Sequence, residues 1–454
     1  MKELDKPSRD LVQWMVKHPD EVIRQRHDIQ ERLVKRRCLY GDATMQTTLM
    51  PLILKPKALE LIRRTSELMD RIVDKVVDLF FTDDQVRESF PAHFEIPMTW
   101  IEGKPGYAKS TVLNRLDVIF DGKTLKFIEF NTDNPGGRGW TDTIEDIFAE
   151  SSLYQDLISN TGYVPGSRRI DQLQFEALMA CFNEWSGGAE KPRLAIASYA
   201  GIGSRGDDEI VRDYFIEKGV EANLIDPRDF ELSGGRLRSN GVTFNLLLRG
   251  MTSRFFLKYP RELREFVRGV NAGAVCTVNS FRGTLGSEKS ILSFLSNPLN
   301  HHYFTPEEAR AIKDHIPWTR KFDETVTLSP DGDEVSIKAF MANNRERLVI
   351  KPTTGAGGYG VMVGKTTDPL VWLDTIDDHI GSPYWIVQDY VEIPTVKLPI
   401  IKANKVVVES RYLNLSPYVF GGRYAGMLGR VSSQDVINVS AGGGVIPVFP
   451  GREG

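Results

Sequence analysis

The chain is poor in the residues that build disulfide frameworks and metal clusters. It contains three cysteines, Cys38, Cys181 and Cys276, and seven histidines in 454 residues. An odd number of widely separated cysteines predicts reduced thiols rather than disulfide bonds, and it favours a cytoplasmic location. These residues show no recurrent metal-ligand spacing, and the adjacent pair His301-His302 is best interpreted as part of a surface turn.

Long apolar runs and an excess of basic charge are also missing. No stretch approaches the roughly 20 apolar residues of a membrane-spanning helix, and residues 1–6 lack the apolar run of a signal peptide. We therefore expect no membrane partner. The formal net charge of −4 gives no reason to expect nucleic acid as a partner. The hydrophobic content of 41% is ordinary for a globular protein.

The pattern along the chain predicts an α/β protein made of several lobes, because one ordinary core does not accommodate this length. Residues 1–94 are expected to be mainly helical, since apolar residues in their second half recur at helical spacing. Residues 95–165 contain a predicted β-hairpin. Strand and helix patterns alternate in residues 166–300, which predicts a parallel sheet. Residues 301–454 read mainly as strands with glycine-rich loops.

The predicted hairpin at residues 116–131 holds the first candidate site. Asp121-Gly122 between two apolar strands favours a turn. Because side chains alternate along a strand, pairing of the two strands can bring an arginine, two carboxylates and an amide together. Such a set suits Mg²⁺ held together with nucleotide phosphates, and an ordinary solvated sheet face is the alternative interpretation. The four residues are Arg115, Asp117, Glu129 and Asn131.

A second candidate site lies in a glycine-rich loop after the predicted strand at residues 347–352, which ends in Lys351. Backbone N–H groups of such a loop can bind phosphate oxygens while the lysine supplies positive charge. The loop is not a Walker motif, because no Gly-Lys-Ser/Thr closes it. A purely structural hairpin would not need so many glycines, so we favour nucleotide binding. The candidate glycines are Gly355, Gly357, Gly358 and Gly360.

The apolar strand at residues 384–391 ends in polar residues, and an apolar slot of this kind suits a purine ring, although an ordinary buried strand fits as well. Its candidate contacts are Gln388, Asp389, Tyr390 and Val391. The last stretch contains two arginines suited to carboxylate or phosphate, Arg411 and Arg430, and a glycine cluster at residues 438–444.

One further motif has two interpretations. Residues 201–206 match the glycine spacing of a dinucleotide fingerprint, and Asp226 follows at about the distance of a ribose-binding acid. Short motifs of this kind often occur by chance. We favour a tight loop that faces the substrate over a nicotinamide site.

Together these motifs resemble the ATP-grasp superfamily, and in particular its circularly permuted branch, whose best-known type is glutathionylspermidine synthase. The strand ending in Lys351 and its glycine loop look like the phosphate-binding hairpin of that family. Lys289 is placed like the earlier lysine that also reaches the nucleotide, and residues 388–391 are similar to the segment that contacts adenine. The resemblance covers the chain from about residue 100 onward.

The resemblance implies an ATP-grasp fold with a parallel-sheet pre-ATP-grasp domain, and it implies ATP and Mg²⁺ as cofactors. The metal roles of the family would belong to Asp117, Glu129 and Asn131, which precede the glycine loop as in the permuted branch. Arg115 would face the transferring phosphate, and Arg430 is the second candidate catalytic residue.

The segment at residues 132–140 departs from the synthase type, where threonine and serine follow the hairpin. We therefore expect this segment to select the substrates and do not carry over glutathione and spermidine. Its candidate substrate contacts are Asp133 and Arg138, with Arg411 as a third.

The expected function is a ligase that joins a carboxylate, from an amino acid or small peptide, to an amine through an acyl phosphate. A small-molecule kinase or a non-catalytic nucleotide-binding protein is the alternative. A homodimer is possible.

Overall fold

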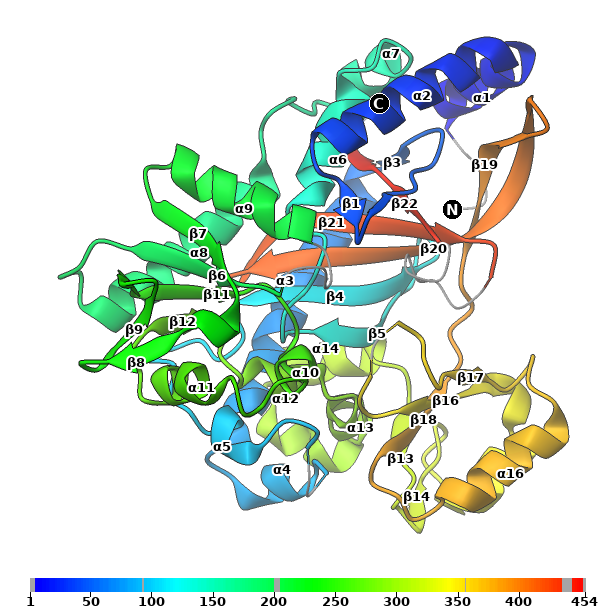
Figure 1. The fold of residues 1–454 in the computed structure, drawn as a ribbon. Helices are drawn as coiled ribbons and strands as arrows, with labels where there is room; N and C mark the ends of the chain where they lie inside the picture. The colour runs from blue at the N-terminus through cyan, green and yellow to red at the C-terminus, as the bar shows by residue number, and fades with distance from the viewer. Residues whose placement is uncertain (1–4, 92–93, 200–204, 356, 435–442, 452–454) are drawn as a thin grey trace.

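A six-stranded antiparallel sheet lies at the centre of the computed structural model, which describes residues 5–91, 94–199, 205–355, 357–434 and 443–451. The strand order is β22-β21-β20-β4-β5, and β19 pairs with β20 outside this path (Figure 1). The sheet therefore joins a segment near residue 120 to the C-terminal strands. Its members are β4 (Leu113–Phe120), β5 (Leu125–Asn131), β19 (Thr395–Lys402), β20 (Lys405–Phe420), β21 (Arg423–Ser432) and β22 (Gly444–Ile446).

The β4–β5 pair confirms the predicted hairpin. Asp121 accepts backbone hydrogen bonds from Lys123 and Thr124, at 2.8 and 2.7 Å, which stabilises the turn. The register places Arg115 opposite Asn131 and Asp117 opposite Glu129. All four side chains consequently lie on the same face of the sheet.

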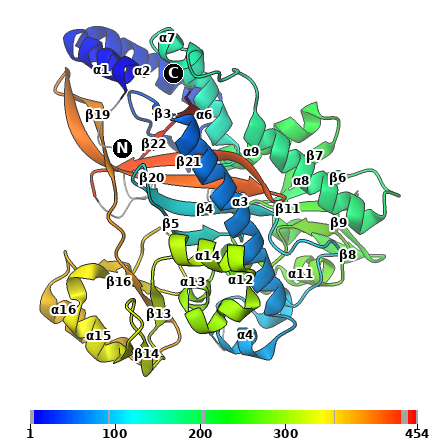
Figure 2. The same cartoon turned by 180° about the vertical axis from the view of Figure 1, so that it is seen from behind.

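The other face of the central sheet is covered by the long helix α3 (Pro56–Leu79), which crosses it in Figure 2. Asn114, next to Arg115 on β4, donates to the buried carboxylate of Asp70 on α3. Because neighbouring residues of a strand point to opposite faces, Arg115 and Asp117 point away from α3. The N-terminal region is mainly helical, and its other long helices are α1 (Lys6–Lys17) and α2 (Pro19–Lys35).

A four-stranded parallel sheet, in the order β12-β11-β6-β7, confirms the α/β pattern predicted for the middle of the chain. A small antiparallel sheet that we did not predict adjoins it, built from β8 (Glu231–Ser233), β9 (Arg236–Ser239) and β10 (Val242–Phe244). The parallel strands are β6 (Arg193–Ala197), β7 (Glu221–Ile225), β11 (Leu246–Arg249) and β12 (Cys276–Val278), and the helices nearby are α8 (Arg169–Ser186), α9 (Arg205–Glu217), α10 (Ser253–Phe256) and α11 (Arg264–Asn271).

Residues 318–389 form a small lobe (yellow in Figure 1) with a hydrophobic core of its own. This core includes the fully buried Trp372. The antiparallel sheet of the lobe has the order β13-β18-β16-β17. The chain then returns to the central sheet, so residues 301–454 contribute both to the lobe and to the central sheet. The lobe contains β13 (Thr319–Lys321), β14 (Val326–Leu328), β15 (Glu334–Ser336), α15 (Ile337–Asn343), β16 (Leu348–Pro352), β17 (Met362–Val363), α16 (Pro369–His379) and β18 (Trp385–Asp389).

In the part of the chain that the structure describes, no helix has both the length and the apolar character needed to cross a membrane.

Short elements connect these units. The connecting elements are β1 (Leu39–Tyr40), β2 (Ala43–Thr44), β3 (Leu52–Leu54), α4 (Asp84–Glu88), α5 (Met98–Ile101), α6 (Trp140–Ala149), α7 (Gln155–Ser159), α12 (Gly283–Ser287), α13 (Ser290–Ser296), α14 (Pro306–His315) and β23 (Val448–Pro450).

Candidate functional site

A cavity of about 660 Å³ is formed where the central sheet, the small lobe and the segment after β5 meet. A volume of this size is typical of cofactor and small-molecule sites. Most of the residues that the sequence singled out line it. They are Arg115, Asp117, Glu129, Asn131, Lys289, Lys351, Gly355, Gly357, Gly358, Gln388, Asp389, Tyr390, Val391 and Arg430.

Asp117 is the most strongly held carboxylate in the cavity. Its Oδ2 lies 2.6 Å from Nη2 of Arg430, and its Oδ1 lies 3.2 Å from Nε of Arg115. Burial works to raise the pKa of Asp117, but the guanidinium groups of Arg430 and Arg115 outweigh it and lower this pKa to about 2. The carboxylate is therefore ionised at neutral pH.

Arg430 is buried and fixed by neighbours on β20. It donates to Oδ1 of Asn414 and to Oγ of Ser416, with Nη2 distances of 2.6 and 2.9 Å. These contacts hold the guanidinium beside the metal-ligand candidates. Asn414, which the sequence analysis missed, lines the cavity as well.

Two lysines reach the same cavity from different elements. Lys289, at the start of α13, lies 3.1 Å from Oε1 of Glu129 and donates to the carbonyl of Gly355 at 3.0 Å. Lys351, on β16, donates to Oε1 of Gln388 at 2.7 Å. Burial lowers the pKa of Lys351, Glu129 opposes the shift and nearby Lys289 adds to it, and together they bring this pKa to about 8. Two cations thus face a hairpin that carries two carboxylates.

The strands β16 and β17 confirm the predicted hairpin around the glycine-rich loop. Gly355 adopts φ +108°, a backbone conformation that residues other than glycine rarely adopt. Gly355, Gly357 and Gly358 line the cavity, so their backbone approaches it closely, whereas Gly360 packs against Pro352.

The hairpin carries a donor set that fits Mg²⁺. Asp117, Glu129 and Asn131 offer carboxylate and amide oxygens on one face, and Nδ2 of Asn131 is buried without a hydrogen-bond partner among the described residues. Mg²⁺ usually takes one or two protein carboxylates and completes its octahedron with phosphates and water. Within the described residues, no group of three or more His, Cys, Asp or Glu side chains is placed to hold a metal.

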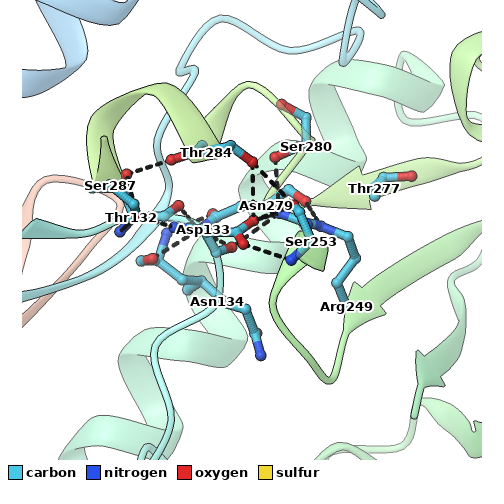
Figure 3. A network of polar contacts seen from close by, with 12 residues as sticks. Thr132, Asp133, Asn134, Arg249, Ser253, Thr277, Asn279, Ser280, Thr284 and Ser287 are labelled. Carbon is cyan, nitrogen blue, oxygen red and sulfur yellow. Dashed lines mark hydrogen bonds and ion pairs between the residues drawn. The ribbon is translucent and has the colours of Figure 1, made fainter. Parts of the chain in front are cut away.

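The segment after β5 is anchored by a buried polar network (Figure 3). Asp133 lies 2.7 Å from Nη2 of Arg249 and accepts hydrogen bonds from the backbone N–H and the hydroxyl of Ser253, both at 2.6 Å. Arg249 also donates to the carbonyl oxygens of Asn279 and Ser280. The network fixes the residues around Ser253, and Thr252, Arg254 and Phe255 line the cavity.

No family model matches the chain. It is 21% identical over 476 residues to an uncharacterized protein, sll0335, of Synechocystis sp. (strain ATCC 27184 / PCC 6803 / Kazusa), covering 96% of this chain and 92% of that protein. The apo structure of a glutathione synthetase-like effector, GSS30, from Globodera pallida superposes with a TM-score of 0.63 at 12% identity, over 95% of this chain and 97% of that one.

The chain thus shares the fold of the glutathione synthetase-like effector. A putative gamma-glutamylcysteine synthetase from Methylobacillus flagellatus KT is less similar, with a TM-score of 0.42 and 10% identity over 84% of this chain and 87% of that one. That likeness is too weak to support an argument about the site.

Three predicted substrate contacts lie outside the cavity lining. Arg138 is 1% exposed, and its guanidinium pairs with Asp208 at 3.0 Å. Asp133 belongs to the buried network, and Arg411 pairs with Glu409 at 2.7 Å. These pairings are what the structure shows for the three residues, and their contact with a substrate stays a prediction.

The dinucleotide-like motif falls largely outside the described residues, which omit 200–204, and the later glycine cluster at 438–444 does so up to residue 442. Asp226 is described, and its carboxylate is 2.7 Å from Nη2 of Arg228. This pairing leaves Asp226 engaged within its own turn.

Sequence reasoning also missed the cavity residues around Ser253. One signal could have found them: they follow Arg249, which ends a parallel strand, and ligands of α/β proteins gather beyond the carboxyl ends of such strands.

Proposed function

We propose that the protein is an ATP- and Mg²⁺-dependent ligase that joins a carboxylate to an amine. The observation that carries the proposal is the convergence of four features in one cavity. These are the glycine hairpin, two lysines, the polar face of the β4–β5 hairpin and a buried arginine. The fold shared with the glutathione synthetase-like effector agrees with this proposal.

The nucleotide would lie between the small lobe and the central sheet. Backbone N–H groups of the glycine hairpin would donate to phosphate oxygens, while Lys289 and Lys351 neutralise their charge. Residues 388–391, at the end of β18, would border the purine ring. Glu129, which pairs with Lys289 in this structure, would be one of the residues that hold the metal.

Asp117, Glu129 and Asn131 would hold Mg²⁺, which supplies charge neutralisation at the phosphates during transfer. Arg430 is held by hydrogen bonds to Asn414 and Ser416 as well as by Asp117, so its position does not depend on Asp117 alone. Arg115 is held by the carbonyl of Gly136 at 3.1 Å and presents its remaining N–H groups to developing negative charge.

The carboxylate substrate would accept the γ-phosphoryl group and become an acyl phosphate. The amine then attacks the acyl carbon, and an amide and phosphate form while ADP remains. The protein's contribution would be positioning and charge stabilisation. We further infer the permuted order of the family, because the metal-binding hairpin precedes the glycine hairpin along the chain.

ADP release with pairs of acids and amines, followed by mass analysis of the products, tests the proposal. Hydroxylamine in place of the amine should trap the activated acid as a hydroxamate. A stable phosphorylated product that resists hydroxylamine would identify a kinase instead. Absence of ATP binding by calorimetry would overturn the nucleotide assignment itself.

A further inference from the structure

One part of the cavity wall comes from none of the proposed nucleotide- or metal-binding elements. It is built by the β1–β2 hairpin, the start of α6 and the start of α10, and it is rich in aromatic side chains. We call this part the aromatic wall. Its members are Tyr40, Trp140, Thr252, Arg254 and Phe255.

Two aromatic side chains of the wall are available to a ligand. Tyr40 is 45% exposed and Phe255 is 38% exposed, although large apolar side chains usually pack inside. Tyr40 packs edge-on against Trp140, with ring centroids 6.3 Å apart. An apolar group that enters the cavity would remove this aromatic surface from water.

The wall also carries hydrogen-bond donors that lack protein acceptors. Among the residues that the structure describes, Nε1 of Trp140 and Oγ1 of Thr252 are buried without a partner. Trp140 itself is only 5% exposed. Buried polar groups without partners are uncommon, and both of these belong to residues that line the cavity. Neither atom is exposed in this structure, so each could donate to a bound molecule only after its side chain turns toward the cavity.

The charge of the wall selects for an anion. Arg254 is partly exposed, and its nearest carboxylate, that of Glu95, lies 3.6 Å away. None of the described residues that form the wall is acidic. A polyamine would therefore meet a cation and unpaired donors, whereas a carboxylate would meet complementary groups.

We propose that the substrate bound against the aromatic wall is an amino acid or small peptide with an aromatic or bulky apolar side chain. Its carboxylate pairs with Arg254, its other acceptors take the N–H of Trp140 and the hydroxyl of Thr252, and its apolar side chain contacts Tyr40 and Phe255. This inference rests on the proposed ligase function and names the substrate class of the same cavity.

Calorimetry on the full chain with ADP and Mg²⁺ tests the proposal, with L-phenylalanine, L-leucine, glycine, L-glutamate and spermidine as probes. Phenylalanine or leucine should bind at least tenfold more tightly than glycine. Equal or tighter binding of glycine or glutamate, or tightest binding of spermidine, would overturn the proposal. So would the lack of binding by all five probes together with activity on a small aliphatic or cationic substrate.

Two variants sharpen the test. Phe255→Ala should weaken phenylalanine binding roughly tenfold and leave glycine binding unchanged, and Trp140→Phe should weaken binding by removing one N–H while retaining an aromatic ring. Tyr384→Ala is the matched control, because Tyr384 is 40% exposed and does not line the cavity. Equal effects of Phe255→Ala and Tyr384→Ala on phenylalanine binding would contradict the assignment.

The two proposals can fail separately. ATP binding with selection of a non-aromatic substrate would refute the aromatic wall and leave the ligase intact. Tight phenylalanine binding without any ATP binding would refute the proposed ligase function and leave the assignment of the aromatic wall intact.

Discussion

Asp117 and Arg430 lie 313 residues apart in the sequence and form a buried ion pair, with 2.6 Å between Oδ2 and Nη2. The pair joins the hairpin strand β4 to the late strand β21 across β20. Because Asn414 and Ser416 on β20 hold the same guanidinium, the three strands share one polar cluster. Asp117, one of the metal-ligand candidates, is thus positioned by residues from β20 and β21, late in the chain.

Asp117→Asn should destabilise the protein, because two buried guanidinium groups would lose their carboxylate. Removing one partner of a buried ion pair costs about 3–5 kcal/mol. The folded-state pKa of Asp117, about 2, lies below its ordinary value of 3.8, so its stabilisation is present above pH 3.8 and is lost as pH falls toward 2. Urea unfolding at several pH values checks this, and the difference between variant and wild type should shrink toward pH 2.

Glu129→Gln should preserve folding and reduce turnover roughly a hundredfold, on the order of 2.7 kcal/mol in the barrier. The amide is a poorer Mg²⁺ ligand than the carboxylate, so half-maximal rate should require more Mg²⁺. Steady-state rates across a Mg²⁺ titration measure both effects. Glu409→Gln is a suitable control, since Glu409 also pairs with a lysine, Lys402, but does not line the cavity. A Glu129 variant with the Mg²⁺ dependence of the wild type would mean that the hairpin is an ordinary sheet face.

Lys351→Ala should raise the Kd for ATP tenfold or more, about 1.4 kcal/mol, because the charge beside the glycine hairpin is lost. The pKa of Lys351 in the free protein is about 8, so its ammonium form is lost as pH rises through that value. ATP affinity of the wild type should therefore fall above pH 8, by at most tenfold per pH unit for this one group. Calorimetry from pH 7 to 9.5 tests this. In Lys351→Arg the decline should disappear, because arginine stays protonated. A wild-type affinity that is constant over this range would contradict the placement of phosphates beside Lys351.

The hairpin and the parallel sheet could be predicted because their signals are local. Period-two alternation places Arg115 and Asp117 on one face, and the strand register brings Glu129 and Asn131 to it. The pairings of Arg138 and Asp133 could not be predicted in this way. Their partners, Asp208 and Arg249, lie 70 or more residues away, and only tertiary packing decides that these side chains turn inward.

The same reason explains why the aromatic wall was missed. Tyr40 and Trp140 are far apart in the chain and carry no motif, and they become neighbours only in the fold. The glycine loop could be recognised because a loop whose backbone must approach a ligand closely needs glycines, and glycines are visible in the sequence. Residue types that chemistry demands are thus visible in the sequence, whereas contacts across the fold are not.

Arg138→Ala should mainly reduce stability, by about 3 kcal/mol or more at pH 8, where Asp208 is ionised beside Arg138, because it leaves Asp208 buried without its guanidinium partner. Burial raises the pKa of Asp208 to about 7 even beside Arg138, and the variant should raise it further. A carboxyl whose folded-state pKa is raised costs stability as pH rises, so the loss should be larger at pH 8 than at pH 6. Urea unfolding at both pH values tests this, and the double variant Arg138→Ala/Asp208→Asn should recover part of the loss. A rise in the KM of one substrate with unchanged stability would instead restore Arg138 as a substrate contact.

Asp133→Asn should alter substrate binding although Asp133 does not line the cavity. The carboxylate accepts both the backbone N–H and the hydroxyl of Ser253, and it faces the charge of Arg249. The amide can keep one of these hydrogen bonds but leaves Arg249 uncompensated, so the neighbouring Thr252, Arg254 and Phe255 should lose their fixed positions. We expect the KM of the carboxylate substrate to rise roughly tenfold while the Kd for ATP stays within about twofold.

A measurement of stability separates this positioning effect from general loss of the fold. Ser253→Ala removes one hydroxyl from the same network and leaves the charges intact, so it should show a smaller increase in KM in the same direction. For both variants, urea unfolding curves should show that the protein is folded in the absence of denaturant. If the KM for the substrate and the Kd for ATP rose in parallel, the network would be supporting the whole cavity. An increase confined to the KM of the substrate would place the effect of the variants at α10, which is the element that Asp133 holds.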